Sequence, residues 1–319
     1  MAFINVCERS PLVLFLLIPI LAESTITIKN KPLQPYDVRM SQFNMAHMKG
    51  ELDNSTFSLF KNLNGLKIEK CAISHLTPNT FENTHLEILD INDNIEFPTI
   101  TSDTFKYLQK LKVFRFTSNS YTTIEEGSFT KLENLDVLVI SHQFLKNITK
   151  SFLEGLNNLR ELSLTFNEVE YINQDAFEHM KELTAIFLGN NLIKTIIPGT
   201  FKNQLKLEDL QLQDNQLGND ENFHNINWKN FDRIISLRFL NIAKNYLNYI
   251  NIKDLVTTFP LLISVNFLPN NMTCSNELYI TNKLRHYRIQ IEYYGNDLSN
   301  CKKFDLSLGT VVFDTNGFK

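Results

Sequence analysis

Cysteine and histidine are the side chains in this sequence best suited to chemistry, and their spacing decides what they could do. The chain has 319 residues, of which four are cysteine and seven are histidine. No histidines stand at the His-x3-His or His-Glu-x-x-His spacing of a metal site, and none clusters with cysteine as zinc requires. A Gly-x-Ser-x-Gly turn and glycine-rich phosphate loops are also absent from the sequence. We therefore expect no enzyme activity, no metal and no cofactor.

The first 22 residues predict a signal peptide. An apolar run from Pro11 to Leu21 follows a polar start, and Ala22 offers a small residue for cleavage. This run is too short to span a bilayer and fits the apolar core of a signal. The start is atypical because Glu8 offsets Arg9, and a buried strand is the less favoured alternative because nothing precedes it to pair with. No later stretch is long and apolar enough to span a membrane, so we expect a secreted, extracellular chain without membrane insertion.

Cysteine pairing follows from that setting. Once Cys7 leaves with the signal peptide, Cys71, Cys274 and Cys301 remain, an odd number in an oxidising compartment. Two of the three can form a disulfide, and the third is either buried or bridges to another chain. The residues alone leave this choice open.

Three Asn-x-Ser/Thr triplets add a second kind of chemistry, N-linked glycosylation, at Asn54, Asn147 and Asn271. A chain this rich in asparagine contains such triplets by chance, so they do not themselves indicate secretion. Given secretion, Asn54 and Asn147 are expected in accessible loops. Asn271 stands beside a cysteine and is expected to be more crowded.

The charge balance narrows the class of partner. Lysine and arginine total 31 and aspartate and glutamate 35, a net charge of −4, and the pI is about 6.0. Nucleic-acid binding draws on a surplus of basic residues that this chain does not have. We therefore expect a protein partner and no nucleic acid.

An internal repeat must position all of these residues. The pattern Leu-x-x-Leu-x-Leu-x-x-Asn is clear at Leu159–Asn167 and Leu183–Asn191, and it recurs about every 24 residues. About ten copies are present, and the first (Met40–Met48) and last (Leu262–Asn270) are degenerate. The second apolar position of each copy falls at Phe43, Leu66, Leu89, Phe114, Leu138, Leu162, Ile186, Leu210, Leu240 and Val265.

This pattern resembles the leucine-rich repeat family in its extracellular form, over about residues 36–301. The resemblance implies an α/β solenoid, a horseshoe of about ten repeats with a parallel sheet on its concave side and a disulfide cap at its C-terminal end. The expected organisation is a signal peptide (1–22), an N-terminal shield (23–39), the solenoid (40–270), the cap (271–301) and a tail (302–319).

The resemblance also assigns the cysteines. Cys71 occupies the asparagine position of its repeat, where the family allows cysteine, which implies a buried and inert thiol. The segment Leu268–Leu278 resembles the family's C-terminal cap, although Met272 and Asn276 replace its tryptophan and second cysteine. A Cys274–Cys301 disulfide is therefore implied, together with a helix over Glu277–His286.

Two columns of the repeat explain the excess of asparagine and phenylalanine. The asparagine column is expected to bond the backbone of adjacent coils, and the phenylalanine column to stack as a spine. A six-residue excess around Gly218–Trp228 is expected as a surface loop. The asparagine column is 94, 119, 167, 191, 215, 245 and 270, and the phenylalanine column is 57, 81, 105, 129, 152, 177, 201 and 231.

Solvent-facing positions of the strands are the candidate binding surface. Six apolar residues at such positions are expected to be exposed and to contact a partner, because exposed apolar clusters mark interfaces. The alternative is that strand propensity alone places them there. These residues are Val113, Val137, Val139, Phe166, Phe187 and Phe239.

The function that these expectations favour is non-catalytic extracellular protein–protein recognition through the concave face. The sequence is most similar to insect-type leucine-rich repeat proteins, related to Toll-like receptor ectodomains and small secreted immune proteins. That similarity implies innate immunity or cell-surface signalling, with an extracellular protein ligand or receptor as partner. An ectodomain fragment of a membrane receptor or adhesion protein, and a secreted enzyme inhibitor, are the alternatives.

Overall fold

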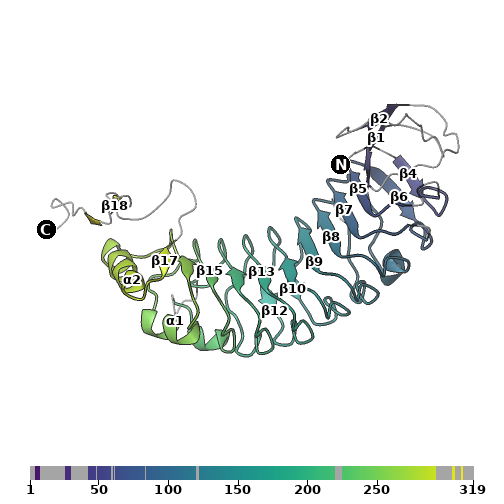
Figure 1. Cartoon of the computed structure of the whole chain (residues 1–319). Coiled ribbons are helices and arrows are strands. Elements are labelled where there is room, and N and C mark those ends of the chain that lie inside the picture. Colours follow the sequence, from purple (N-terminus) through teal and green to yellow (C-terminus); the bar gives the residue numbers. More distant parts are fainter. Residues whose placement is uncertain are drawn as a thin grey trace.

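The computed structural model describes residues 4–7, 26–29, 42–47, 49–58, 60, 62–82, 84–119, 122–219, 225–291, 304–305 and 310–311. The described chain winds into an arc of stacked coils (Figure 1). Strands line the inner, concave side of the arc, and helix α1 (Ile252–Thr258) lies on its outer side. Helix α2 (Cys274–His286) stands at the C-terminal end of the stack.

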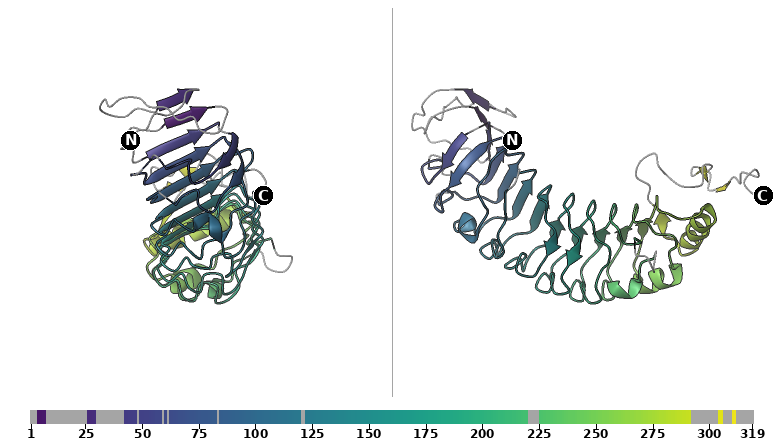
Figure 2. Two further views of the ribbon diagram at one scale, coloured as in Figure 1. Left: turned by 90° about the vertical axis from the view of Figure 1, so that its right-hand side faces the viewer. Right: turned by 180° about the vertical axis from the view of Figure 1, so that it is seen from behind.

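Each of the ten predicted repeats contributes one strand to a single parallel sheet, whose strands stack in chain order (Figure 2). An eleventh strand, β17, follows α2 and pairs with the last repeat. Strand β17 was not predicted, because its residues carry no Leu-x-Leu pattern. The strands are β3 (Gln42–Ala46), β5 (Gly65–Glu69), β7 (Ile88–Asn92), β8 (Val113–Thr117), β9 (Val137–Ser141), β11 (Glu161–Ser163), β13 (Ala185–Phe187), β14 (Asp209–Gln211), β15 (Phe239–Asn241), β16 (Ser264–Asn266) and β17 (Gln290–Ile291).

Shorter elements accompany this sheet. Three parallel pairs are β1 (Ile4–Cys7) with β2 (Ile26–Lys29), β4 (Lys49–Leu52) with β6 (Ala72–Leu76), and β10 (Asn147–Ile148) with β12 (Tyr171–Ile172). One antiparallel pair joins β18 (Phe304–Asp305) to β19 (Thr310–Val311), and the 3-10 helices are η1 (Ser102–Phe105) and η2 (Trp228–Phe231). Strands β1 and β2 fall within the expected signal peptide and N-terminal shield. Most of those two segments lies outside the described residues, and both assignments stay predictions.

The predicted phenylalanine spine is present. All eight side chains are buried, and five neighbouring pairs of rings have centroids 5.6 to 5.9 Å apart. Phe259 extends the spine, with its ring centroid 6.2 Å from that of Phe231. Trp228 corrects an expectation, since its side chain is 2% exposed and packs on Phe231 and Phe259. The six-residue excess therefore ends in a core residue at the start of η2, and only part of it can be a surface loop.

The predicted asparagine ladder is also present. In the coil of β13, the Asn191 side chain accepts a hydrogen bond from the backbone N–H of Val169 and donates to the carbonyl of Leu164, both in the preceding coil. The other asparagines of the column make equivalent bonds one coil back. Cys71 occupies the same column as a fully buried thiol, as the resemblance implied. Its Sγ lies 3.2 Å from the carbonyl oxygen of Glu69.

The residue before this column turns the chain away from the sheet. In nine successive coils it adopts the left-handed conformation, with φ between 51° and 57°, and none of the nine uses glycine there. This position explains how the chain forms tight turns with only 10 glycines. Its occupants are His47, Lys70, Asp93, Ser118, His142, Phe166, Asn190, Asp214 and Lys244.

The C-terminal helix begins three residues earlier than expected. Thr273 caps α2 by accepting a hydrogen bond from the backbone N–H of Asn276, and Ile280 and Leu284 face the core. Cys274, the first residue of the helix, is disulfide-bonded. Cys301 lies outside the described residues, so its pairing with Cys274 stays a prediction.

Candidate recognition surface

Val113, Val137 and Val139, which we call the valine patch, form one contiguous surface on the concave sheet. Val113 pairs directly with Val137 across β8 and β9, and Val139 lies two residues further along β9 on the same face. All three side chains are half-buried rather than exposed, because neighbouring strands of a closely stacked sheet cover part of each. Ile88 pairs with Val113 and extends the patch toward the N-terminus, a neighbour that the sequence-based selection missed.

The three predicted phenylalanines lie around this patch at different distances. Phe187 is half-buried on β13, separated from Val139 by the single register partner Ser163. Phe239 is exposed on β15, where Asp209 lies between it and β13. Phe187 therefore lies one strand beyond the valine patch on the same face, and Phe239 stands further from it.

Phe166 occupies the left-handed turn at the edge of the sheet rather than the strand itself. Its ring stacks on that of His142 in the preceding coil, with centroids 4.9 Å apart and planes 8° from parallel, and the side chain is 49% exposed. A bulky residue with positive φ is unusual. The pair therefore presents a flat aromatic surface beside the concave face.

Charged groups flank the valine patch on its N-terminal side. Arg115 on β8 bonds to Asp90 on β7 at 3.0 Å, and Lys67 on β5 forms an ion pair with Glu69. Burial would raise the pKa of Glu69, but hydrogen bonds from Lys67 and Asn44 outweigh it and hold the pKa below its ordinary value. On the C-terminal side the corresponding strand positions carry amides instead, at Gln211, Asn241 and Asn266.

The two edges of the coils differ in character. At the edge where the chain enters each strand, neighbouring coils are linked by ion pairs, such as Lys112 with Glu87 at 2.9 Å and Lys206 with Glu182 at 2.6 Å. At the edge where the chain leaves the strand, the residue after the asparagine column is apolar and exposed in alternate coils. These residues, which we call the edge row, are Ile95, Phe144, Leu192 and Tyr246.

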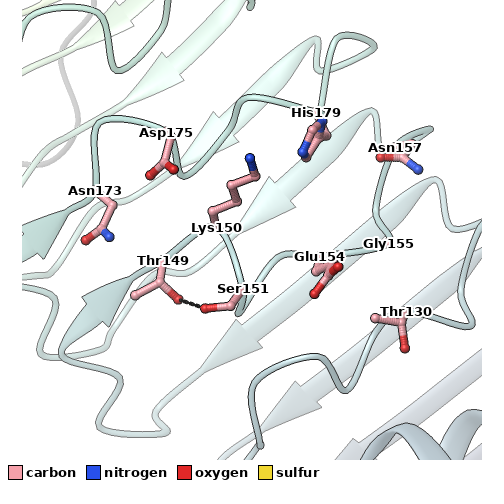
Figure 3. A pocket seen from close by; sticks show the side chains of 10 residues that line it. All are labelled: Thr130, Thr149, Lys150, Ser151, Glu154, Gly155, Asn157, Asn173, Asp175 and His179. Carbon is pink, nitrogen blue, oxygen red and sulfur yellow. Dashed lines mark hydrogen bonds between the residues drawn. The ribbon is translucent and has the colours of Figure 1, made fainter.

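A hollow of about 760 Å³ lies where the segments following β10 and β12 meet (Figure 3). Hydroxyls, amides and charges of both signs line it, including Thr149, Ser151, Asn173, Asp175 and His179. Lys150 at its margin bonds to Glu178 at 2.7 Å, a bond that raises the pKa of the lysine and lowers that of the glutamate. Nowhere in the described part of the chain do three His, Cys, Asp or Glu side chains gather as a metal site.

The glycosylation triplets are all accessible. Asn54 is exposed in the turn after β4, and Asn147 is exposed at the start of β10. Asn271 is exposed as well, so the expected crowding is not found there.

Comparisons with known proteins agree with this architecture. The model of the leucine-rich repeat family matches residues 84–143, 133–193 and 157–217. No curated protein matches the chain. Among solved structures, a chain of the Toll–Spatzle complex from Drosophila aligns with a TM-score of 0.63 and 17% identity, covering 80% of this chain and 36% of that chain. The glycosylated form of that complex gives a TM-score of 0.65 and 18% identity, with 91% and 42% covered.

A complex of TLR13 with the single-stranded RNA ssRNA13 is similarly close, with a TM-score of 0.62 and 22% identity, covering 78% of this chain and 36% of that one. The present chain thus spans well under half the length of the solved chains that it matches. At these identities the likeness concerns the fold. As for membrane insertion, the described residues contain no helix with the length and apolarity to cross a bilayer.

Proposed function

The chain is a leucine-rich repeat solenoid, and from that fold we propose that it recognises an extracellular protein, without catalysis, through its concave face. The observation that carries the proposal is the valine patch together with Phe187. A strand face that met only water would be expected to alternate apolar core with polar surface. Here four solvent-side positions near the centre of the sheet are apolar instead, which is the pattern of a contact surface.

The Toll–Spatzle structures support the choice of a protein partner. Toll was solved in complex with Spatzle, a complex described as a molecular hub in Drosophila development and innate immunity. An immune or cell-surface signalling role for this chain is part of the proposal and rests on that likeness and on the similarity noted from the sequence. Secretion rests on residues 1–22 alone.

Protein is preferred to nucleic acid on grounds of charge. One structural relative, TLR13, was solved in complex with the single-stranded RNA ssRNA13. The present chain has a net charge of −4, and its central concave residues include the three valines and Phe187, while Arg115, the register partner of Val139, is held in an ion pair with Asp90. Without a basic stripe, phosphate contacts would contribute little to binding.

Two alternatives remain within the same fold. Because this chain spans only 36 to 42% of its solved relatives, a portion of a larger receptor ectodomain is one. A secreted enzyme inhibitor is the other, and the same concave surface would serve it. A panel of extracellular proteases and lipases assayed with the chain would identify the inhibitor.

The test is a double substitution on the concave face. The secreted chain is used to capture partners from extracellular fluid, and the captured proteins are identified by mass spectrometry. Val139→Asp with Phe187→Asp should abolish capture, because two carboxylates would be desolvated in the interface. The matched control is Leu205→Asp with Ile235→Asp, two exposed apolar residues elsewhere on the coils, which should leave capture unchanged.

Circular dichroism must show that both double variants remain folded. Capture that survives the concave-face substitutions would place the site elsewhere. Binding of a labelled single-stranded RNA at physiological salt, measured by fluorescence anisotropy, would instead favour nucleic acid as the ligand.

A further inference from the structure

The edge row is more exposed than ordinary surface composition requires. Ile95, Phe144, Leu192 and Tyr246 are 73%, 59%, 36% and 48% exposed, and they occupy the same position in every second coil. Phe144 and Tyr246 also adopt the left-handed conformation, with φ of 57° and 62°. A bulky side chain held outward in a sparsely populated conformation points to a role at the surface.

The triplet at Asn271 opens directly beside this row. Asn271 lines a hollow of about 430 Å³ whose other walls include Leu192 and Tyr246. Asp214 and Lys244 also line it and supply polar groups. A group attached to the Asn271 side chain would therefore start inside a hollow with one aromatic wall and several hydrogen-bonding groups.

The triplet at Asn147 also has an exposed tyrosine beside it. Asn147 and Tyr171 are register partners in the parallel pair of β10 and β12, and both side chains are exposed. Parallel partners lie about 4.8 Å apart and point to the same face. Phe144 of the edge row stands three residues before Asn147, and Thr149, two residues after it, lines the larger hollow of Figure 3.

We propose that N-linked glycans on Asn147 and Asn271 fold back onto the protein, where their first N-acetylglucosamine units cover Tyr171 and Tyr246. Such a sugar has one face of C–H groups, which packs against an aromatic ring, and a rim of hydroxyl and amide groups that bond to polar neighbours. The protein thus supplies both surfaces that the sugar needs. The proposal rests on the extracellular part of the proposed function.

Attachment follows the usual chemistry of these triplets. The Asn side-chain nitrogen forms a bond to C1 of the first sugar as the bond from C1 to a lipid-linked pyrophosphate breaks. The amide proton is released, and the lipid pyrophosphate is the leaving group. The oligosaccharide donor is supplied by the secretory pathway of the host cell.

Asn54 provides a matched control within the chain. Its side chain is exposed in a turn that its neighbours Asp53, Ser55 and Thr56 hold together through hydroxyl and carboxylate hydrogen bonds. None of the large exposed apolar side chains of the described residues belongs to this turn. A glycan on Asn54 would extend into water.

The experiment places the full chain behind a heterologous signal peptide in a eukaryotic host, so that export does not depend on residues 1–22. Mass spectrometry of glycopeptides measures occupancy, which should be high at Asn147 and Asn271. Trimming to a single N-acetylglucosamine should leave the melting temperature unchanged. Asn271→Gln should lower it by about 2–4 °C, the shift expected from losing one aromatic packing contact.

Substituting the two tyrosines distinguishes packing of the glycan on the ring from an effect of glycosylation alone. In a Tyr246→Ser background, Asn271→Gln should lower the melting temperature no further. In a Tyr171→Ser background, Asn147→Gln should likewise lower it no further. Asn54→Gln should leave the melting temperature unchanged throughout. Fluorescence of an apolar dye should rise at least twofold when the glycans of Asn147 and Asn271 are removed.

Three results would overturn the proposal. They are empty Asn147 and Asn271 sites on the exported chain, loss of stability that is independent of the tyrosines, and a dimer of the fully glycosylated chain, measured by light scattering, that Tyr246→Ser abolishes. Such a dimer would show that the edge row contacts a second copy of the chain. Partner capture through the concave face is measured in a separate experiment. Failure of one proposal therefore does not affect the test of the other.

Discussion

The side-chain oxygen of Asn191 accepts a hydrogen bond from the backbone N–H of Val169, which lies 3.0 Å away in the preceding coil. The nitrogen of the same amide donates to the carbonyl of Leu164 at 2.9 Å, also one coil back. One buried side chain thus satisfies a donor and an acceptor that the turn would otherwise leave without partners. This relationship recurs along the stack and ties each coil to its predecessor.

Replacing Asn191 by leucine should therefore lower the free energy of unfolding. Each buried polar group left unpaired costs about 1–3 kcal/mol. Urea denaturation followed by circular dichroism measures the loss. Asn134→Ala is the control, because Asn134 also bonds to a neighbouring coil, through its Nδ2 to the carbonyl of Gln109, but at an exposed site. An equal loss in the two variants would contradict the role given to burial.

Phe129→Ala should be among the most destabilising substitutions. The ring is fully buried and lies 5.9 Å from that of Phe105 and 5.7 Å from that of Phe152, between centroids. Truncating a buried phenylalanine costs about 3–5 kcal/mol, and Phe129→Leu should cost clearly less because it leaves a smaller cavity. An unchanged thermal melting curve for Phe129→Ala would refute the spine.

Ser118 tests the left-handed turn. Its φ is 54°, where a residue with a Cβ is disfavoured by about 1–2 kcal/mol and glycine is not. Ser118→Gly should leave stability within about 0.5 kcal/mol of the wild type, because glycine's extra unfolded-state entropy offsets the relief. Ser118→Val should lower it. Thr117→Gly, one residue earlier within β8, should be destabilising, and the same loss at both positions would contradict this explanation.

Glu69 should contribute stability that depends on pH. Its pKa is lowered in the folded chain, where Lys67 pairs with it and Asn44 donates a hydrogen bond at 2.9 Å. Since the folded pKa lies below the unfolded one, the contribution is complete above about pH 4.3, the ordinary value for glutamate, and is lost as the pH falls through the folded pKa.

The difference in unfolding free energy between the wild type and Glu69→Gln should accordingly shrink on acidification, as measured by denaturation at a series of pH values. Glu87→Gln, in an exposed ion pair with Lys112, should change stability little at any pH. A difference for Glu69→Gln that stays constant down to pH 2 would show that the carboxylate contributes nothing as a charge.

The features that recur in every coil could be predicted from the sequence alone. Asn191 and Phe129 could be assigned to the interior because their columns recur at the spacing of the leucines. Trp228 could not, since it follows an irregular excess of residues, and only the packing around Phe231 and Phe259 shows that it belongs to the core. Strand β17 was missed because its residues carry no Leu-x-Leu pattern.

The candidate surfaces were predicted less well than the core. Periodicity tells which side a strand residue faces, but not how much its neighbours cover it, so Val113 and Val137 are half-buried where exposure was expected. The edge row was overlooked because the candidate positions ended at the residue before the asparagine column. Its signal was nevertheless in the sequence, since Phe144 and Leu192 are separated by 192 − 144 = 48 residues, two full repeats.

Strand β17 has a consequence for the size of the particle. A stack in which every coil copies the last has no inherent length, and its open edge is a template on which further coils, or another molecule, could polymerise. Here the edge beyond β16 is only two residues long, Gln290 and Ile291, and α2 precedes it. An arriving strand would find few backbone groups to bond. Among the described residues, the sheet therefore ends on a short strand that offers few backbone groups for edge-to-edge pairing.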